Sequence, residues 1–156
     1  MLINKAIERS GSAQCWIPGD SLEVRMPGRI LIVDDVVTKR VILRGKLKAA
    51  RYHALEACDG KEALTITRTE NPDLILMDLS MPEMNELEVC RVLKSDHKTS
   101  KIPVIIFSAY LNVRTKLNAL EAGAEEFMAK PLDEVALMAR IRSLLRARHV
   151  TEELVS

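Results

Sequence analysis

Short apolar runs alternate with amphipathic segments along the chain from Arg29 onward. A continuous apolar run indicates a strand buried on both faces, whereas apolar residues spaced three or four apart indicate a helix. Strands are predicted at the runs RILIV (29–33), YHALEA (52–57), DLILM (73–77), IPVIIF (102–107) and EEFMA (125–129). Helices are predicted over residues 37–50, 61–70, 86–96, 113–124 and around 137–145.

Two of the predicted helices differ in the regularity of their apolar face. The helix at 113–124 has an apolar row that comprises Val113, Leu117, Leu120 and Ala124, and Gly123 suits its C-terminal end. The helix at 37–50 is less regular, because Arg40 interrupts its apolar row and Gly45 costs about 1 kcal/mol relative to alanine. We expect the stem of Arg40 to lie along the surface with its charged head in water.

The alternation of strand and helix predicts the fold class. Consecutive strand–helix units favour a parallel sheet, since parallel strands need helical crossovers, which are right-handed in nearly all proteins. We therefore predict an α/β fold, a doubly wound sandwich with helices on both faces of one sheet. The folded domain is expected over residues 29–148, followed by a short C-terminal tail at 149–156.

Residues 1–28 have a different character from the rest. They hold several glycine, serine and proline residues and show no sustained periodicity. We expect an N-terminal arm that is mostly disordered. One hypothesis is that Met26 is the natural start of the protein and that the preceding residues are upstream sequence.

Composition and charge narrow the class of protein. The chain has 156 residues, of which 47% are hydrophobic and 29% charged, and its formal net charge is +1. A protein that binds nucleic acid usually carries a strong excess of positive charge, which this chain lacks. No apolar run approaches the roughly 20 residues that span a bilayer. Cys15, Cys58 and Cys90 are far apart, which argues against a disulfide framework or a zinc site. We expect a cytoplasmic protein that binds neither nucleic acid nor membrane.

Polar side chains gather where the predicted strands end. Asp34 and Asp35 follow the first strand, Asp78 the third, Ser108 the fourth and Lys130 the fifth. Ligands of open α/β sheets bind outside these carboxyl ends. Each residue has a simpler interpretation, such as a helix cap for either aspartate of the pair or a solvated surface lysine, but their common location weakens it.

The acidic residues at this edge imply a cation. Three crowded carboxylates repel one another, and a hard divalent ion with oxygen ligands, Mg²⁺ above all, would relieve that repulsion. An aspartate carboxylate such as Asp78 can act as a nucleophile and form an aspartyl-phosphate. Lys130 would then place a compact positive charge beside the phosphoryl oxygens, and the Ser108 hydroxyl would supply a hydrogen bond.

Four motifs in order, ILIVDD, LILMDLSMPEM, VIIFSA and FMAKP, resemble the receiver domain of two-component response regulators. The resemblance covers residues 29–148. The segments GRILIVDD and LMARIRSLLR are most similar to the leading receiver of PleD-type diguanylate cyclase regulators. The resemblance to receiver domains implies a flavodoxin-like (βα)5 fold with a parallel five-stranded sheet in the order 2-1-3-4-5.

The resemblance also implies a role for each matching residue. Asp78 would be the phosphoacceptor. Asp35 and Asp78 would bind Mg²⁺ directly, Asp34 through water and Ser80 through its carbonyl. Lys130 would bind the phosphoryl group, and its bond to Pro131 would be a cis peptide bond. Ser108 and Phe127 would form the switch. Ala109 would leave room for the phosphoryl group, and Tyr110 would tune hydrolysis together with Ser80.

One residue departs from the family pattern. Glu86 stands where the family usually has glycine, and a glutamate held at positive φ would be strained or would force another turn. The residues after 148 in this sequence contain no cyclase motif, and we expect neither a cyclase nor a DNA-binding output domain. We therefore expect no enzymatic activity beyond self-phosphotransfer and self-dephosphorylation.

The first functional hypothesis is a phosphorylation switch. Its partners would be a sensor histidine kinase or a histidine phosphotransfer protein, and a downstream protein target. The surface of helix four, strand five and helix five would change on phosphorylation, with a homodimer as one candidate assembly.

Two other functions stay open. Glu86 and Arg40 motivate a receiver-fold interaction module that works without phosphate. A phosphatase of the haloacid dehalogenase type is a weaker alternative, since such enzymes want a second aspartate where this chain has Ser80.

Overall fold

The computed structural model describes residues 28–79, 84–109 and 112–155. Its sheet has five strands, all paired in parallel, in the order β2-β1-β3-β4-β5. The strands are β1 (Arg29–Val33), β2 (His53–Ala57), β3 (Leu74–Leu79), β4 (Val104–Ser108) and β5 (Glu126–Ala129). The predicted fold class and strand order are therefore confirmed.

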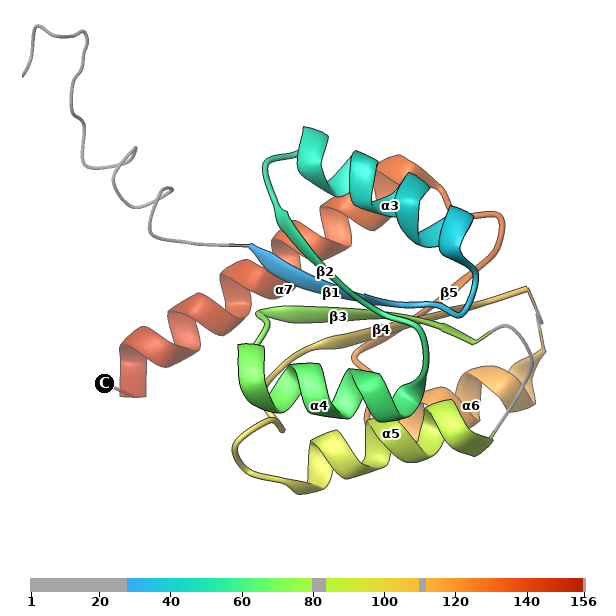
Figure 1. Cartoon of the computed structure of the whole chain (residues 1–156). Helices are drawn as coiled ribbons and strands as arrows, with labels where there is room; N and C mark the ends of the chain where they lie inside the picture. Colours follow the sequence, from blue (N-terminus) through green and yellow to red (C-terminus); the bar gives the residue numbers. More distant parts are fainter. Residues whose placement is uncertain (1–27, 80–83, 110–111, 156) are drawn as a thin grey trace, which may run out of the picture.

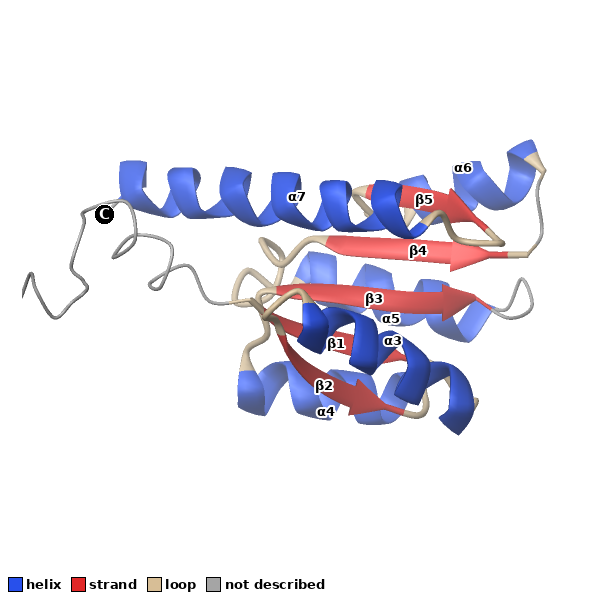
Figure 2. Ribbon diagram, turned by 90° about the horizontal axis from the view of Figure 1, so that it is seen from above, coloured by secondary structure: helices blue, strands red, loops and turns tan. Residues whose placement is uncertain are grey.

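Five helices cover the two faces of the sheet. They are α3 (Val37–Ala49), α4 (Gly60–Glu70), α5 (Met84–Ser95), α6 (Val113–Glu121) and α7 (Glu134–Val155). Helices α3 and α7 lie on one face, and α4, α5 and α6 lie on the other (Figures 1 and 2). Helix α7 continues to Val155, so it extends past residue 148, where we expected the domain to end.

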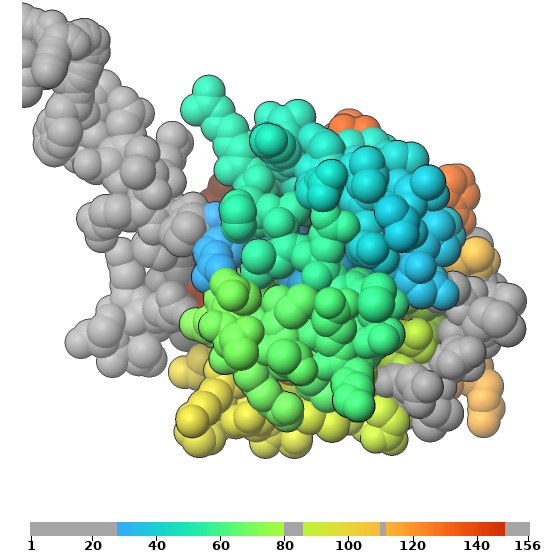
Figure 3. Space-filling view, viewed as in Figure 1, coloured from blue at the N-terminus to red at the C-terminus, as the bar shows by residue number. Residues whose placement is uncertain are grey.

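The strands are apolar throughout because each of their faces lies in a core. In β1, Ile30 and Ile32 pack toward α3 and α7, whereas Leu31 and Val33 pack in the core beneath α4, α5 and α6. Successive side chains of a strand point to opposite faces, so a two-sided core needs an unbroken apolar run. The strand β2 is at the sheet edge and is only partly covered between α3 and α4 (Figure 3).

Gly28 marks a close contact at the start of the sheet. A Cβ atom there would lie 2.0 Å from Cδ1 of Tyr52, so only glycine fits against this ring. The backbone carbonyl of Gly28 accepts a hydrogen bond from the N–H of His53. This contact joins the beginnings of β1 and β2.

Helix α6 corrects the expectation drawn from its apolar row. Val113 and Leu117 are exposed, at 73% and 50%, and Leu120 is 38% exposed. The buried side of the helix carries Thr115 and Ala119 instead. Small side chains let the helix lie close to the sheet, so the larger apolar residues on the neighbouring face remain in solvent.

Arg40 corrects a second expectation. Its guanidinium is not in open water: the side chain is 14% exposed and pairs with Glu56 of β2. Helix α3 buries Leu47 alone among its residues, while Val37, Val41 and Ile42 are exposed. The polar contact of Arg40 therefore contributes to holding a helix that buries little apolar surface.

Glu86 lies within the first turn of α5, which begins at Met84. Among the described residues, the non-glycine residues with positive φ are Arg51 and Asn71, so Glu86 is not strained in this way. The chain thus accommodates glutamate by starting the helix before this position. Gly123, with φ of 107°, follows the end of α6 as predicted.

Candidate functional site at the carboxyl ends of the strands

Asp78 lies at the centre of the candidate site. It is the fifth residue of β3 and is 3% exposed. The Lys130 ammonium donates a hydrogen bond of 2.7 Å to its Oδ2 atom. Lys130 also lies 5.8 Å from the centre of the Phe107 ring, whose electron-rich face attracts a cation. The structure therefore brings together two of the predicted residues, Asp78 and Lys130.

A second lysine approaches the same oxygen atom. The Nζ atom of Lys39, in the first turn of α3, is 3.9 Å from Oδ2 of Asp78. Its side chain is half exposed, so water screens this interaction more than it screens the Lys130 pair. We did not predict Lys39 or Phe107 from the sequence. Lys39 follows Asp35 by four residues, about one helical turn, and this spacing is the sequence feature that could have predicted its position beside Asp78.

Asp34 lies beside Asp78 and is 7% exposed. Its pKa is raised from 3.8 to about 6, first by burial and then by a hydrogen bond with Asp78 that Asp34 can donate only when protonated. Repulsion by the Asp78 carboxylate raises the pKa further, while the backbone N–H of Val36 and the charge of Lys39 oppose the change. The crowding of carboxylates predicted from the sequence is therefore present at this pair.

The residues fit a cation at this pair. Oδ1 of Asp78 is buried and has no N–H or hydroxyl donor among the described residues. A buried carboxylate oxygen without a donor, next to a second carboxylate whose pKa is raised, is an environment that a divalent cation would stabilise.

No third acidic side chain joins this pair in the part of the chain that the structure describes. Asp35 is exposed. In the described segments, no three Asp, Glu, His or Cys side chains lie close enough together to hold a metal ion. The immediate neighbour of Asp78 is thus Asp34, and direct ligation by Asp35 stays a prediction. Ser80, predicted to contribute its carbonyl, lies outside the described residues, as does Tyr110.

A cavity of about 310 Å³ opens over these side chains. Its polar lining comes from Asp34, Lys39, Lys46, Asp78 and Lys130, and its apolar lining from Ile42, Leu43, Phe107, Pro131 and Leu132. The cavity therefore lies between α3 and the segment that joins β5 to α7. It presents two carboxylates and three ammonium groups to whatever enters.

Ser108 and Phe127 lie on the opposite face of the sheet from Asp78. Phe127 is registered with Ile106, two residues before Ser108, so the two predicted switch residues share the face covered by α4, α5 and α6. Ser108 is fully buried and Phe127 is 9% exposed. Both side chains are thus buried in this structure, and their role as a switch stays a prediction.

The backbone links the fourth and fifth strand ends at the site. The N–H of Lys130 donates to the carbonyl of Ser108. The Lys130–Pro131 peptide bond is cis, as the resemblance implied. Ala109 is exposed beside these residues.

Some polar residues near this edge have structural partners. The side chain of Asp59 accepts a hydrogen bond from the N–H of Glu62 and caps α4, and the side chain of Glu62 accepts one from the N–H of Cys58. Cys58 and Cys90 are free thiols. No helix in the described segments is both long and apolar enough to cross a membrane.

Comparison with known proteins agrees with this geometry. A sequence profile for the response regulator receiver domain matches residues 30–142. The chain belongs to this family. This receiver domain is 43% identical over 129 residues to the response regulator PleD of Caulobacter vibrioides, which covers 83% of the chain and 28% of PleD. It is 42% identical over 118 residues to the probable transcriptional regulator ycf27 of Cyanophora paradoxa, which covers 76% of the chain and 48% of that protein.

Solved structures show the same fold. The signal receiver domain of a signal transduction histidine kinase from Syntrophus aciditrophicus matches with a TM-score of 0.71 and 35% identity, over 77% of this chain and 91% of that one. The receiver domain of the Francisella response regulator 1452 matches with a TM-score of 0.70 and 28% identity, over 77% and 98%. The receiver domain spans half or less of the two curated relatives described above, so it corresponds to one part of them.

Proposed function

We propose that this receiver domain accepts a phosphoryl group on Asp78. The observation that carries the proposal is the buried Asp78 carboxylate, which has Asp34 on one side and the Lys130 ammonium at 2.7 Å on the other. A carboxylate held by the end of a rigid strand is already oriented as a nucleophile. The phosphoryl donor would be a phosphohistidine on a sensor histidine kinase or on a histidine phosphotransfer protein.

The transfer balances as a displacement at phosphorus. An Asp78 oxygen forms the new P–O bond while the P–N bond of phosphohistidine breaks, and the departing imidazole nitrogen keeps the bonding electrons and takes up a proton from solvent. Lys130 turns its ammonium from Asp78 toward the phosphoryl oxygens, where it offsets their negative charge. The ring of Phe107 limits the space in which that ammonium can settle.

Mg²⁺ would be held beside Asp34 and Asp78; the family implies that Asp35, Asp78 and the Ser80 carbonyl bind it directly and that Asp34 binds it through water. When bound, it supplies positive charge that lowers the repulsion between the aspartates and an incoming phosphoryl group. The same positive charge would offset the cost of keeping Asp34 ionised beside Asp78, which its raised pKa reflects.

The output is proposed to be contact with a downstream protein through the surface of α6, β5 and α7. The exposed apolar row Val113, Leu117 and Leu120 on α6 supports a protein partner, because side chains of this kind gain by leaving water. A homodimer through the same surface is the other outcome that gel filtration of phosphorylated protein would detect.

Glu86 and Arg40 motivated the alternative of an interaction module that needs no phosphate. Glu86 lies in a helix without positive φ, and Arg40 has two defined polar partners. Neither residue now argues against phosphorylation.

Incubation with acetyl phosphate and Mg²⁺ tests the proposal. Intact-mass spectrometry should show a gain of one phosphoryl group for the wild type and none for Asp78→Asn. Asp73→Asn is a matched control, because Asp73 precedes the same strand at its other end and should leave the gain unchanged. Absence of the gain in wild type, or equal labelling of Asp78→Asn, would refute the proposal.

A further inference from the structure

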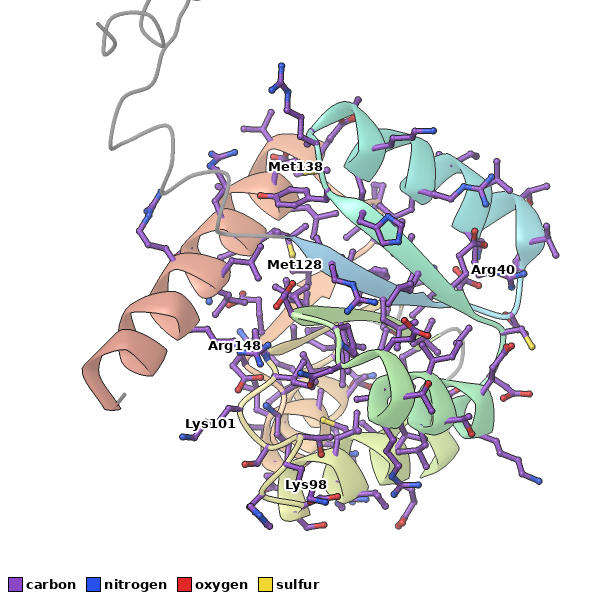
Figure 4. The ribbon with its side chains drawn as sticks, turned by 60° about the vertical axis from the view of Figure 1, so that its left-hand side comes forward. Arg40, Lys98, Lys101, Met128, Met138 and Arg148 are labelled. Carbon is purple, nitrogen blue, oxygen red and sulfur yellow. The ribbon has the colours of Figure 1, made fainter. Side chains whose placement is uncertain are left out.

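Arg40 connects the acidic site to the edge strand of the sheet. Its Nη1 atom donates a hydrogen bond of 2.6 Å to the backbone carbonyl of Asp34. Its Nε atom donates one of 3.0 Å to Oε1 of Glu56 in β2. The guanidinium therefore bridges α3, the end of β1 and β2, and Figure 4 shows it beneath the first turns of α3.

Glu56 is itself held in place from a second side. Its other carboxylate oxygen, Oε2, accepts a hydrogen bond from Arg44, one helical turn after Arg40. The Glu56 side chain is 25% exposed, compared with 48% for Arg44 and 14% for Arg40. Two arginines thus share one carboxylate, but of the two only Arg40 is bonded to Asp34 among the described contacts.

The backbone of Asp34 is held on both sides of the residue. Its N–H donates to the carbonyl of Ala57 at 3.1 Å, and its carbonyl accepts from Arg40. The side chain accepts a hydrogen bond from the N–H of Val36. Ala57 and Glu56 are neighbours in β2, so this strand constrains Asp34 directly through its backbone and indirectly through Arg40.

The start of α3 has little else to hold it. Val36 occupies the N-cap position, where it provides no side-chain hydrogen bond, and Leu47 is the buried residue of the helix. Apart from the Val36 N–H bond to Asp34 and the half-exposed Lys39, whose Nζ atom is 3.9 Å from Asp78, Arg40 is the residue near this helix start that joins it to the rest of the described structure.

We infer that Arg40, held by Glu56, is a positioning residue. It orients the Asp34 peptide and thereby the carboxylates of Asp34 and Asp78, beside which Mg²⁺ is proposed to bind. The inference rests on the proposed function of the site. An arginine suits this role because its planar guanidinium directs separate N–H groups at two acceptors. A lysine at this position could satisfy one acceptor at a time.

The test is a Mg²⁺ titration of wild type, Arg40→Met and Arg44→Met by isothermal titration calorimetry. Arg40→Met should weaken Mg²⁺ binding about tenfold or more, as is typical when a residue behind a metal ligand is lost. Arg44→Met removes a bond to the same Glu56 but none to Asp34, so its affinity should stay near that of wild type. The Mg²⁺ affinity of Arg40→Lys should lie between those of Arg40→Met and wild type.

The Mg²⁺ dependence of Asp78 labelling distinguishes a positioning role of Arg40 from a general loss of structure. With acetyl phosphate, Arg40→Met should need about tenfold more Mg²⁺ for half-maximal labelling of Asp78, while labelling at saturating Mg²⁺ changes less. Urea unfolding of both methionine variants shows whether each is folded, and Arg40→Lys replaces Arg40→Met if that variant is not. Equal Mg²⁺ affinities for the Arg40 and Arg44 variants, or an affinity of the Arg40 variant equal to that of wild type, would overturn the inference.

The failure of this inference can be distinguished from the failure of the proposed function. If wild type is labelled but the two variants bind Mg²⁺ alike, only the role of Arg40 fails. If the Arg40 variant binds Mg²⁺ more weakly but wild type takes up no phosphoryl group, only phosphorylation of Asp78 fails.

Discussion

Asp34 carries an electrostatic penalty in the folded chain. Its pKa is raised to about 6 in the folded chain, mainly because it is buried. Between about pH 4 and about pH 6, the folded state therefore binds more protons at this residue than the unfolded state. The contribution of Asp34 to the free energy of unfolding falls as pH rises through that interval, and the penalty is fully present above it.

Asp34→Asn should remove this penalty. Asparagine keeps an oxygen that can accept the hydrogen bond from Val36 but carries no charge beside Asp78. In Mg²⁺-free buffer, the variant should gain stability relative to wild type as pH rises from about 4 to about 7. Urea unfolding at both pH values measures the difference.

Asp35→Asn is the control for this experiment, since Asp35 is exposed. Its stability relative to wild type should change less over the same interval. A difference between Asp34→Asn and wild type that does not vary with pH would contradict the assignment of the penalty to Asp34.

At the scale of the element, α6 shows that an apolar row does not determine which side of a helix is buried. The row Val113, Leu117 and Leu120 has the spacing of a core face, yet the buried side carries Thr115 and Ala119. The size of the buried residues governs how closely the helix lies to the sheet. A surface row of this kind is available for binding.

Substitutions on the two sides of α6 should therefore have different effects. Leu117→Ser, on the exposed side, should change the free energy of unfolding by less than about 0.5 kcal/mol. Ala119→Leu should destabilise the domain by about 1–3 kcal/mol, because a fully buried alanine has no room for a larger side chain. Urea unfolding compares them, and a larger cost for Leu117→Ser than for Ala119→Leu would show that the helix is rotated.

At the scale of the whole molecule, polar contacts join segments at the edge of the sheet away from Asp78. The ammonium of Lys94, in α5, donates to the carbonyls of Ser100 and Ile102 and to the carboxylate of Glu125. Glu125 also accepts a hydrogen bond from the N–H of Val104, at the start of β4. These bonds tie α5, β4 and the segment before β5 together.

Lys94→Met should destabilise the domain by about 1–3 kcal/mol, because the partly buried carbonyls of Ser100 and Ile102 lose their donor while the apolar stem is kept. Lys98→Met, at an exposed position that Figure 4 shows at the surface, should change stability by less than about 0.5 kcal/mol. Denaturant unfolding of the two variants tests this, and equal midpoints would contradict the role of Lys94.

The sequence by itself determined the elements, the fold class and the chemistry of one sheet edge. Strands buried on both faces must be apolar throughout, so five such runs were recognisable, and the carboxyl ends of parallel strands meet at one edge, which brought Asp78 and Lys130 together. The strand order and the cis bond before Pro131 followed from the resemblance to receiver domains rather than from the pattern.

Only the tertiary structure decided which side chains become partners. It placed Asp34 beside Asp78, brought Lys39 toward the same carboxylate, and paired Arg40 with Glu56. It also turned the large apolar residues of α6 into solvent. These outcomes depend on the rotation of each helix and on distances between strands, and the period of a hydrophobic pattern encodes neither.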